Sequence, residues 1–143
     1  MASVLRTRLR IFRAGPLALT LLVFAGLPVT GHALGLGEIA LQSNLNERLV
    51  AEIPLTDLRG LEAEEIRVSL ASNADFERLG VERFFFLGDL RFQVEISRAG
   101  TGRVRVTSER PITEPYLNFL VQVLWPQGRL LKEYTLLLAP PTF

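Results

Sequence analysis

Between residues 116 and 125 the chain reads YLNFLVQVLW, in which apolar side chains recur at every second position. Such alternation is typical of a β-strand that buries one face. The buried face would carry Leu117, Phe119, Val121, Val123 and Trp125. On the other face Leu120 and Leu124 interrupt the polar residues. A strand that is apolar on both faces lies inside a sheet, so we expect this strand to be central.

Shorter alternating runs, separated by turn residues, lie on both sides of this strand. They cover residues 39–43, 49–55, 66–70, 90–96, 103–106 and 129–138. A helix of two turns is predicted over residues 72–80, where Ser72 caps the start, Phe76 and Leu79 share a face, and Gly80 ends the last turn. Seven strands in about 100 residues predict an all-β fold, a small two-sheet immunoglobulin-like sandwich with one short helix. The pattern leaves open which strand belongs to which sheet.

The N-terminal segment has the pattern of a secretory signal peptide. Four arginines precede an uncharged run of sixteen residues from Ala14 to Val29. Small residues follow at positions 31 and 33, so we predict cleavage between Ala33 and Leu34, which removes residues 1–33. The alternative is a retained membrane anchor, but a membrane span needs about 20 apolar residues and this run contains two prolines. We therefore expect an exported domain, outside the cytoplasm, that meets the membrane only through this segment, if it stays uncleaved.

Composition excludes several function classes for the chain after residue 33. Twelve basic and fifteen acidic side chains give this part a net charge of −3, which does not favour binding to nucleic acid. Cysteine is absent, and the single histidine, His32, lies in the predicted signal peptide. Without these residue types the domain cannot form a Ser-His-Asp triad, a Cys-His pair or an ordinary zinc site. We expect no cofactor and no metal.

Two groups of residues remain as candidates for acid–base chemistry. Glu62, Glu64 and Glu65 are close in sequence, and paired carboxylates can hydrolyse glycosidic bonds across a cleft. They lie in a polar loop, however, so a solvated loop is the favoured interpretation. Lys132 is the only lysine, and a Ser-Lys pair is the second option. Its place on a strand beside Glu133 favours a cross-strand ion pair or a stem packed on the sheet. We expect no enzymatic activity.

Aromatic residues supply the candidate contact surface. Three phenylalanines follow one another at positions 84–86, before a Gly-Asp turn. In an extended segment successive side chains point to opposite faces, so at least one ring reaches the surface or covers a sheet edge. We predict that a partner is contacted by Arg83, Phe84, Phe85, Phe86 and Leu87. We expect Trp125 in the core, whereas an exposed tryptophan would favour the binding of a glycan.

Several longer strings resemble one known family. They are LGLGEI (34–39), GVER (80–83), FLGDLRF (86–92), EPYLNFL (114–120) and WPQGRLLKEYTLLL (125–138). Together they resemble the N-terminal periplasmic domain of the FimV family over the whole chain after residue 33. Members of this family are large inner-membrane proteins of Gram-negative bacteria that support type IV pilus assembly, twitching motility and organisation of the cell pole. In them a linker, a peptidoglycan-binding LysM module, a membrane span and an acidic cytoplasmic part follow this domain.

The resemblance implies a non-catalytic periplasmic interaction or scaffold domain associated with these three processes. Its partners would be envelope or pilus-assembly proteins. The alternative is a module that binds cell-wall glycan, which is disfavoured because the 143 residues include no LysM module. We expect residues 34–139 to form the sandwich. Residues 140–143, which contain Pro140 and Pro141, would begin a proline-rich linker or end the chain.

Overall fold

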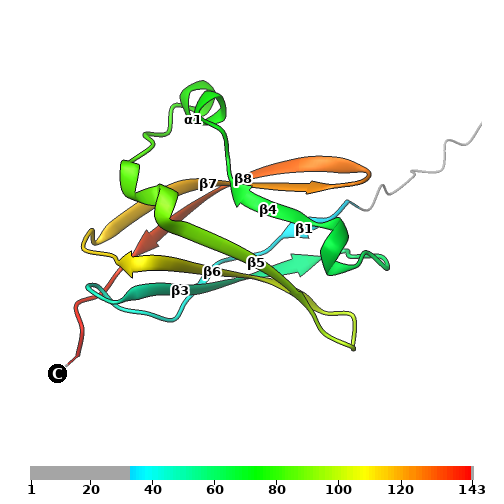
Figure 1. The fold of residues 1–143 in the computed structure, drawn as a ribbon, viewed down its shortest axis with the longest axis horizontal. Helices are drawn as coiled ribbons and strands as arrows, with labels where there is room; N and C mark the ends of the chain where they lie inside the picture. The colour runs from blue at the N-terminus through cyan, green and yellow to red at the C-terminus, as the bar shows by residue number, and fades with distance from the viewer. Residues whose placement is uncertain (1–32, 143) are drawn as a thin grey trace, which may run out of the picture. The chain divides into compact units, whose positions relative to one another are not determined.

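The computed structural model describes residues 33–142, so nearly all of the predicted signal peptide lies outside the described part. This part forms two antiparallel sheets with one α-helix and two short 3-10 helices (Figure 1). The elements, in chain order, are β1 (Gly35–Leu36), β2 (Ala40–Leu41), β3 (Arg48–Thr56), η1 (Ala63–Glu65), β4 (Arg67–Leu70), α1 (Asn73–Leu79), η2 (Phe85–Asp89), β5 (Leu90–Ile96), β6 (Gly102–Pro111), β7 (Tyr116–Trp125) and β8 (Gly128–Leu137). The predicted all-β sandwich is confirmed.

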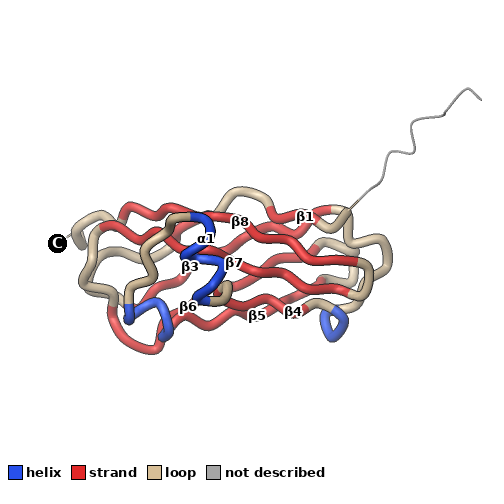
Figure 2. The backbone as a smooth tube through the Cα atoms, turned by 90° about the horizontal axis from the view of Figure 1, so that it is seen from above, coloured by secondary structure: helices blue, strands red, loops and turns tan. Residues whose placement is uncertain are grey.

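The two sheets form separate layers, and the strands of both layers lie roughly along one common axis (Figures 1 and 2). One sheet has the order β1-β3-β6-β5, with β2 also paired to β3, and the other has the order β4-β7-β8. The strand over residues 116–125 is therefore central, as expected. Strand β1 was not predicted, because its two residues, which pair with Leu55 and Thr56, are too few to show an alternation.

The core lies between the two layers. Phe119, Val121 and Val123 of β7 are fully buried there, together with Ile53 of β3 and Val104 of β6. Leu120 points to the outer face of β7 and is nevertheless buried, because α1 lies over this face of the sheet (Figure 1). Of the two apolar interruptions in the alternating pattern of β7, Leu120 thus identifies the position that the helix covers, whereas Leu124 is 37% exposed. No helix within residues 33–142 is long and apolar enough to span a membrane.

The segment that follows Leu34 closes one side of the sandwich. The Lys132 ammonium donates hydrogen bonds to the carbonyl oxygens of Leu36 at 3.1 Å and Gly37 at 3.2 Å, and the Tyr134 hydroxyl donates to Gly37 at 2.8 Å. Burial, reinforced by the charge of Glu38, raises the pKa of Tyr134 well above its usual range. Of the two arrangements expected for Lys132, the cross-strand ion pair does not form within the described residues. Its ammonium instead lies 5.1 Å from the Tyr134 ring centroid and holds the backbone of the first segment.

Candidate contact surface

Helix α1 forms where the capping residues predicted it. The Ser72 side chain accepts a hydrogen bond from the backbone N–H of Asp75 at 3.2 Å, and Gly80 ends the helix in the left-handed region with φ of 68°. Phe76 is 1% exposed and packs into the core. Leu79, which was expected to share that buried face, is 52% exposed, because the helix ends there and only its first turn is covered.

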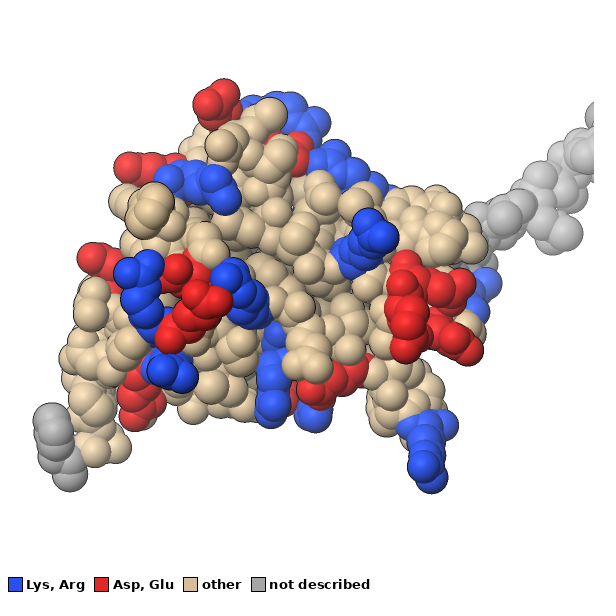
Figure 3. Space-filling model, in the orientation of Figure 1, with Lys and Arg blue, Asp and Glu red and all other residues tan. Residues whose placement is uncertain are grey.

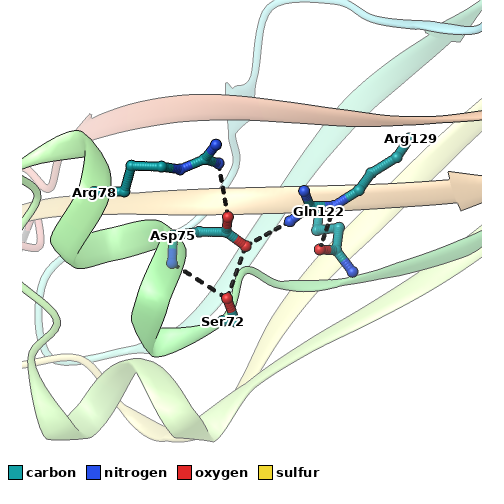
Figure 4. Close-up of polar contacts among 5 residues, drawn as sticks. All are labelled: Ser72, Asp75, Arg78, Gln122 and Arg129. Atoms are coloured by element: carbon teal, nitrogen blue, oxygen red, sulfur yellow. Dashed lines mark hydrogen bonds and ion pairs between the residues drawn. The ribbon is translucent and has the colours of Figure 1, made fainter.

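Asp75 fixes this helix to the sheet below it (Figure 4). Its carboxylate accepts hydrogen bonds from Ser72 at 2.8 Å, from Arg78 at 2.8 Å and from Arg129 of β8 at 2.5 Å. Arg129 also donates to the side chain of Gln122 on β7 at 2.9 Å. The Ser72 hydroxyl, and then the two guanidinium groups, hold the pKa of Asp75 below its usual value against the opposing effect of burial.

The link between α1 and β8 was not predicted from the sequence. The sequence places Asp75 only in the first turn of the predicted helix, and Arg129 lies 54 residues further along the chain. The sequence signal that could have indicated a structural role is the Ser72-to-Asp75 spacing, because a serine cap with an acidic residue three positions later is a start signal for helices. Nothing local to either residue identifies the other as its partner.

The chain after α1 returns over the helix before it reaches η2. Arg83 donates a hydrogen bond to the side-chain oxygen of Asn73, and its guanidinium lies 5.9 Å from the centroid of the Phe76 ring. Both contacts hold residues 81–84 beside the helix. Arg83 therefore contributes to the surface by fixing its position and is already engaged within the chain.

Residues 85–89 form the 3-10 helix η2, so the expectation of an extended segment is wrong. In a 3-10 helix successive side chains point about 120° apart, so three neighbouring rings cannot share one side. Phe85 is 94% exposed and Phe84 is 42% exposed, whereas Phe86 is half-buried and stacks on Phe84 with ring centroids 5.6 Å apart. Leu87 is 1% exposed and belongs to the core rather than to the surface. The exposed part of the predicted contact surface is thus Arg83, Phe84 and Phe85, of which the two rings are apolar.

Two hollows flank Phe85. The first, of about 600 Å³, lies between α1 and η2, and we call it the α1–η2 hollow. Its lining includes Phe76, Glu77, Val81, Glu82, Phe84 and Phe85. The second, of about 250 Å³, lies between η2 and the end of β6, and its lining includes Phe85, Phe86, Arg110, Ile112 and Glu114. The Phe85 ring forms part of the wall of both, so one exposed side chain separates two recesses.

The other candidate residues lie away from this surface. Glu62 precedes η1, and Glu64 and Glu65 lie within it. Acidic side chains gather at the right of the space-filling view (Figure 3). The Glu65 carboxylate accepts a hydrogen bond from the backbone N–H of Glu62 at 2.8 Å, which caps η1. Across residues 33–142, no group of three or more His, Cys, Asp or Glu side chains is arranged to hold a metal ion.

Trp125 is half-buried rather than enclosed. Its ring packs against the core, and it lines a hollow of about 210 Å³ together with Leu34, Leu58 and Leu61. The ring of Phe85 is thus far more exposed than that of the tryptophan. Residues 1–32 lie outside the described part of the chain, so cleavage between Ala33 and Leu34 stays a prediction.

Comparison with known proteins identifies the family. A family model described as the FimV N-terminal, Ig-like domain matches residues 34–141. Two relatives, each named motility hub protein FimV, from the Pseudomonas aeruginosa strains PAO1 and UCBPP-PA14, are 54% identical over 112 residues. The match covers 78% of this chain and 12% of each relative, and no solved structure matches. The chain belongs to the family of FimV N-terminal domains.

Proposed function

We propose that this chain is a non-catalytic periplasmic domain that serves motility by binding an envelope protein through Phe84 and Phe85. The processes served would be type IV pilus assembly, twitching motility and organisation of the cell pole. The name of the two relatives, motility hub protein, supports the link to motility. Because the chain spans about 12% of their length, the partner and the activity are proposed for this domain alone.

The observation that carries the proposal is the exposure of Phe85. A phenylalanine ring buries a large apolar area when it finds a partner, and a ring left 94% exposed between two hollows gains that area only in a complex. Interfaces derive most of their binding energy from a few such anchors. The ion pairs of Asp75 and the contacts of Arg83 hold the surrounding segments in place, which lowers the entropy lost on binding.

Periplasmic location is the second part of the proposal and has its own test. Cleavage between Ala33 and Leu34 would release the domain from the membrane on export. The intact mass of material from the periplasm should then correspond to a chain that begins at Leu34. A species that still carries residues 1–33 would show that the segment is an anchor.

Site-directed photo-cross-linking tests the contact surface. A photoreactive phenylalanine analogue at position 85 should give a defined adduct with an envelope protein in living Gram-negative cells. The same analogue at position 64 is the matched control, because Glu64 is exposed and lies in η1, outside both hollows. Equal adducts at the two positions, or no adduct at position 85, would contradict the proposal.

Sedimentation with purified sacculi separates protein contact from the alternative of glycan binding. The processed domain should stay in the supernatant, because Phe76, the aromatic residue that α1 contributes to the hollow beside Phe85, is 1% exposed and offers no ring face to a sugar. Saturable pelleting that is lost in Phe85→Ser or Trp125→Ala would put cell-wall glycan in place of an envelope protein as the ligand.

A further inference from the structure

We propose that the α1–η2 hollow receives the side chain of an arginine or lysine from the partner that covers Phe85. This inference rests on the proposed function, since it states the chemistry of the partner at the same surface. The argument combines the shape of the hollow with the charges that line it. A surface that recognises a cation should pair aromatic faces with carboxylates whose own partners are missing.

Three of the carboxylates around Phe85 are unpaired. Glu77 and Glu82 line the α1–η2 hollow, and Glu114 lines the second hollow. Within residues 33–142 the side chains of these three glutamates form no hydrogen bond and no ion pair. Most other acidic groups near the strand ends are paired, for example Glu95 with Arg103 at 2.8 Å. The negative charge at this surface is therefore available to a partner.

The cations at the same surface are already engaged. Arg83, the basic residue that lines the α1–η2 hollow, is bonded to Asn73 and lies over the Phe76 ring. Arg110, the basic residue of the second hollow, forms an ion pair with Asp89 at 2.8 Å. Arg110 is thus neutralised by Asp89, whereas Arg83 keeps its positive charge. The two free carboxylates of the α1–η2 hollow outnumber this one charge, so the lining is net negative and favours an incoming cation.

The aromatic lining fits the rest of such a side chain. Arginine and lysine carry apolar stems, and a guanidinium packs readily on an aromatic face. Phe84 and Phe85 offer exposed faces beside Glu77 and Glu82 in one hollow. The stem would cover the rings while the charged head reaches the carboxylates. One side chain would therefore contact both the aromatic and the acidic residues of the hollow.

Amide chemical shifts of the whole processed chain test this assignment. The probe is N-acetyl-arginine amide, and N-acetyl-citrulline amide, which has nearly the same shape without the charge, is the matched control ligand. The arginine probe should move the amide signals of Val81, Glu82 and Gly88, and the citrulline probe should not. Equal shifts from the two probes, or no shift at these amides, overturn the inference.

The double variant E77Q/E82Q tests the carboxylates, and E64Q is its control because Glu64 is exposed outside the hollow. Two exposed charge pairs should account for about a three- to tenfold change in affinity. We expect the arginine probe to bind E77Q/E82Q more weakly by this factor and to bind E64Q with unchanged affinity. Unchanged affinity for the double variant overturns the inference. If E77Q/E82Q does not diminish the cross-link at position 85 in cells, the inference of a basic side chain from the partner is overturned, while the proposed function still stands. If no cross-link forms at position 85, the proposed function fails as well.

Discussion

Strand β7 and the segment 84–87 are both runs of large apolar side chains, yet they differ in how far these side chains are buried. In β7 the inward Phe119, Val121 and Val123 are fully buried, and even the outward Leu120 is covered by α1. In the segment 84–87 only Leu87 enters the core, while Phe85 is almost wholly exposed. Apolar character alone therefore does not determine burial. A period of two matches the pleat of a sheet, whereas three adjacent rings match no element that could bury all of them.

Replacing a buried ring of β7 should give the largest effect on stability. Phe119 is completely buried, with its ring centroid 6.1 Å from that of Tyr134. Phe119→Ala should lower the free energy of unfolding by about 3–5 kcal/mol, because it leaves a cavity in a layer that cannot collapse freely. Urea denaturation followed by circular dichroism measures this. A loss below about 1 kcal/mol would show that β7 contributes less to the core than its burial indicates.

Removing the charge of Asp75 should destabilise the domain less than opening the core does. Asp75→Asn weakens the contacts with Arg78 and Arg129 that hold α1 over β7 and β8. Because the pKa of Asp75 is lowered in the folded state, its stabilisation is complete above the unfolded pKa, about 3.9, and is lost as the pH falls through the lower folded value.

Thermal unfolding at neutral and acidic pH tests this difference. The melting temperature of the wild type should exceed that of Asp75→Asn at pH 7, and the two should converge in strong acid. Gln122→Ala is a useful control, since it removes a neutral partner of Arg129 and should show no such convergence. A difference between wild type and Asp75→Asn that is independent of pH would contradict the electrostatic explanation.

Loss of the Tyr134 hydroxyl should have a smaller effect. Tyr134→Phe keeps the buried ring but removes the hydrogen bond to the Gly37 carbonyl, which still accepts one from Lys132. The expected cost is about 0.5–1.5 kcal/mol, measured by urea denaturation. Hydrogen exchange at the amide of Gly37, which donates to Pro54, should become faster while that of β7 amides stays slow. Faster exchange throughout β7 would mean that the hydroxyl supports the core itself.

The smallest effect on stability is expected at the exposed ring. Phe85→Ser should change the free energy of unfolding by no more than about 0.5 kcal/mol, because the side chain touches little in the free domain. The same change should weaken the partner complex by about 2 kcal/mol or more. Urea denaturation tests the effect on stability, and affinity measured on the same preparation tests the effect on binding. A stability loss comparable to that of Phe119→Ala would show that Phe85 belongs to the core.

The sequence predicted those features that depend on neighbouring residues. The central position of β7 followed from Leu120 and Leu124, and the ends of α1 followed from Ser72 and Gly80. The pairing of Asp75 with Arg129 was not predictable, because the contact depends on how α1 crosses the sheet. Strand β1 was missed because pairing with β3, rather than any pattern of its own, makes it a strand.

The prediction that at least one ring of residues 84–86 reaches the surface is confirmed, whereas the expected extended conformation is wrong. A run of three phenylalanines favours a strand by intrinsic preference. Here the chain bends through η2, where the Leu90 backbone N–H bonds to the Leu87 carbonyl, and β5 begins only at Leu90. The first hollow depends on how α1 lies beside η2, which no local pattern predicts, and the second depends on Arg110, Ile112 and Glu114, which are distant in sequence from Phe85.

The contact between Lys132 and the first segment has a practical consequence for chemical labelling. Lys132 is the only side-chain amine in the chain, and its nitrogen is engaged by two backbone carbonyls. Acylation requires a free, accessible amine, so an amine-reactive reagent should modify Lys132 only when residues 36–37 detach from β8. The rate of acylation, followed by mass spectrometry, then reports how often this side of the sandwich opens, without any probe being introduced into the protein.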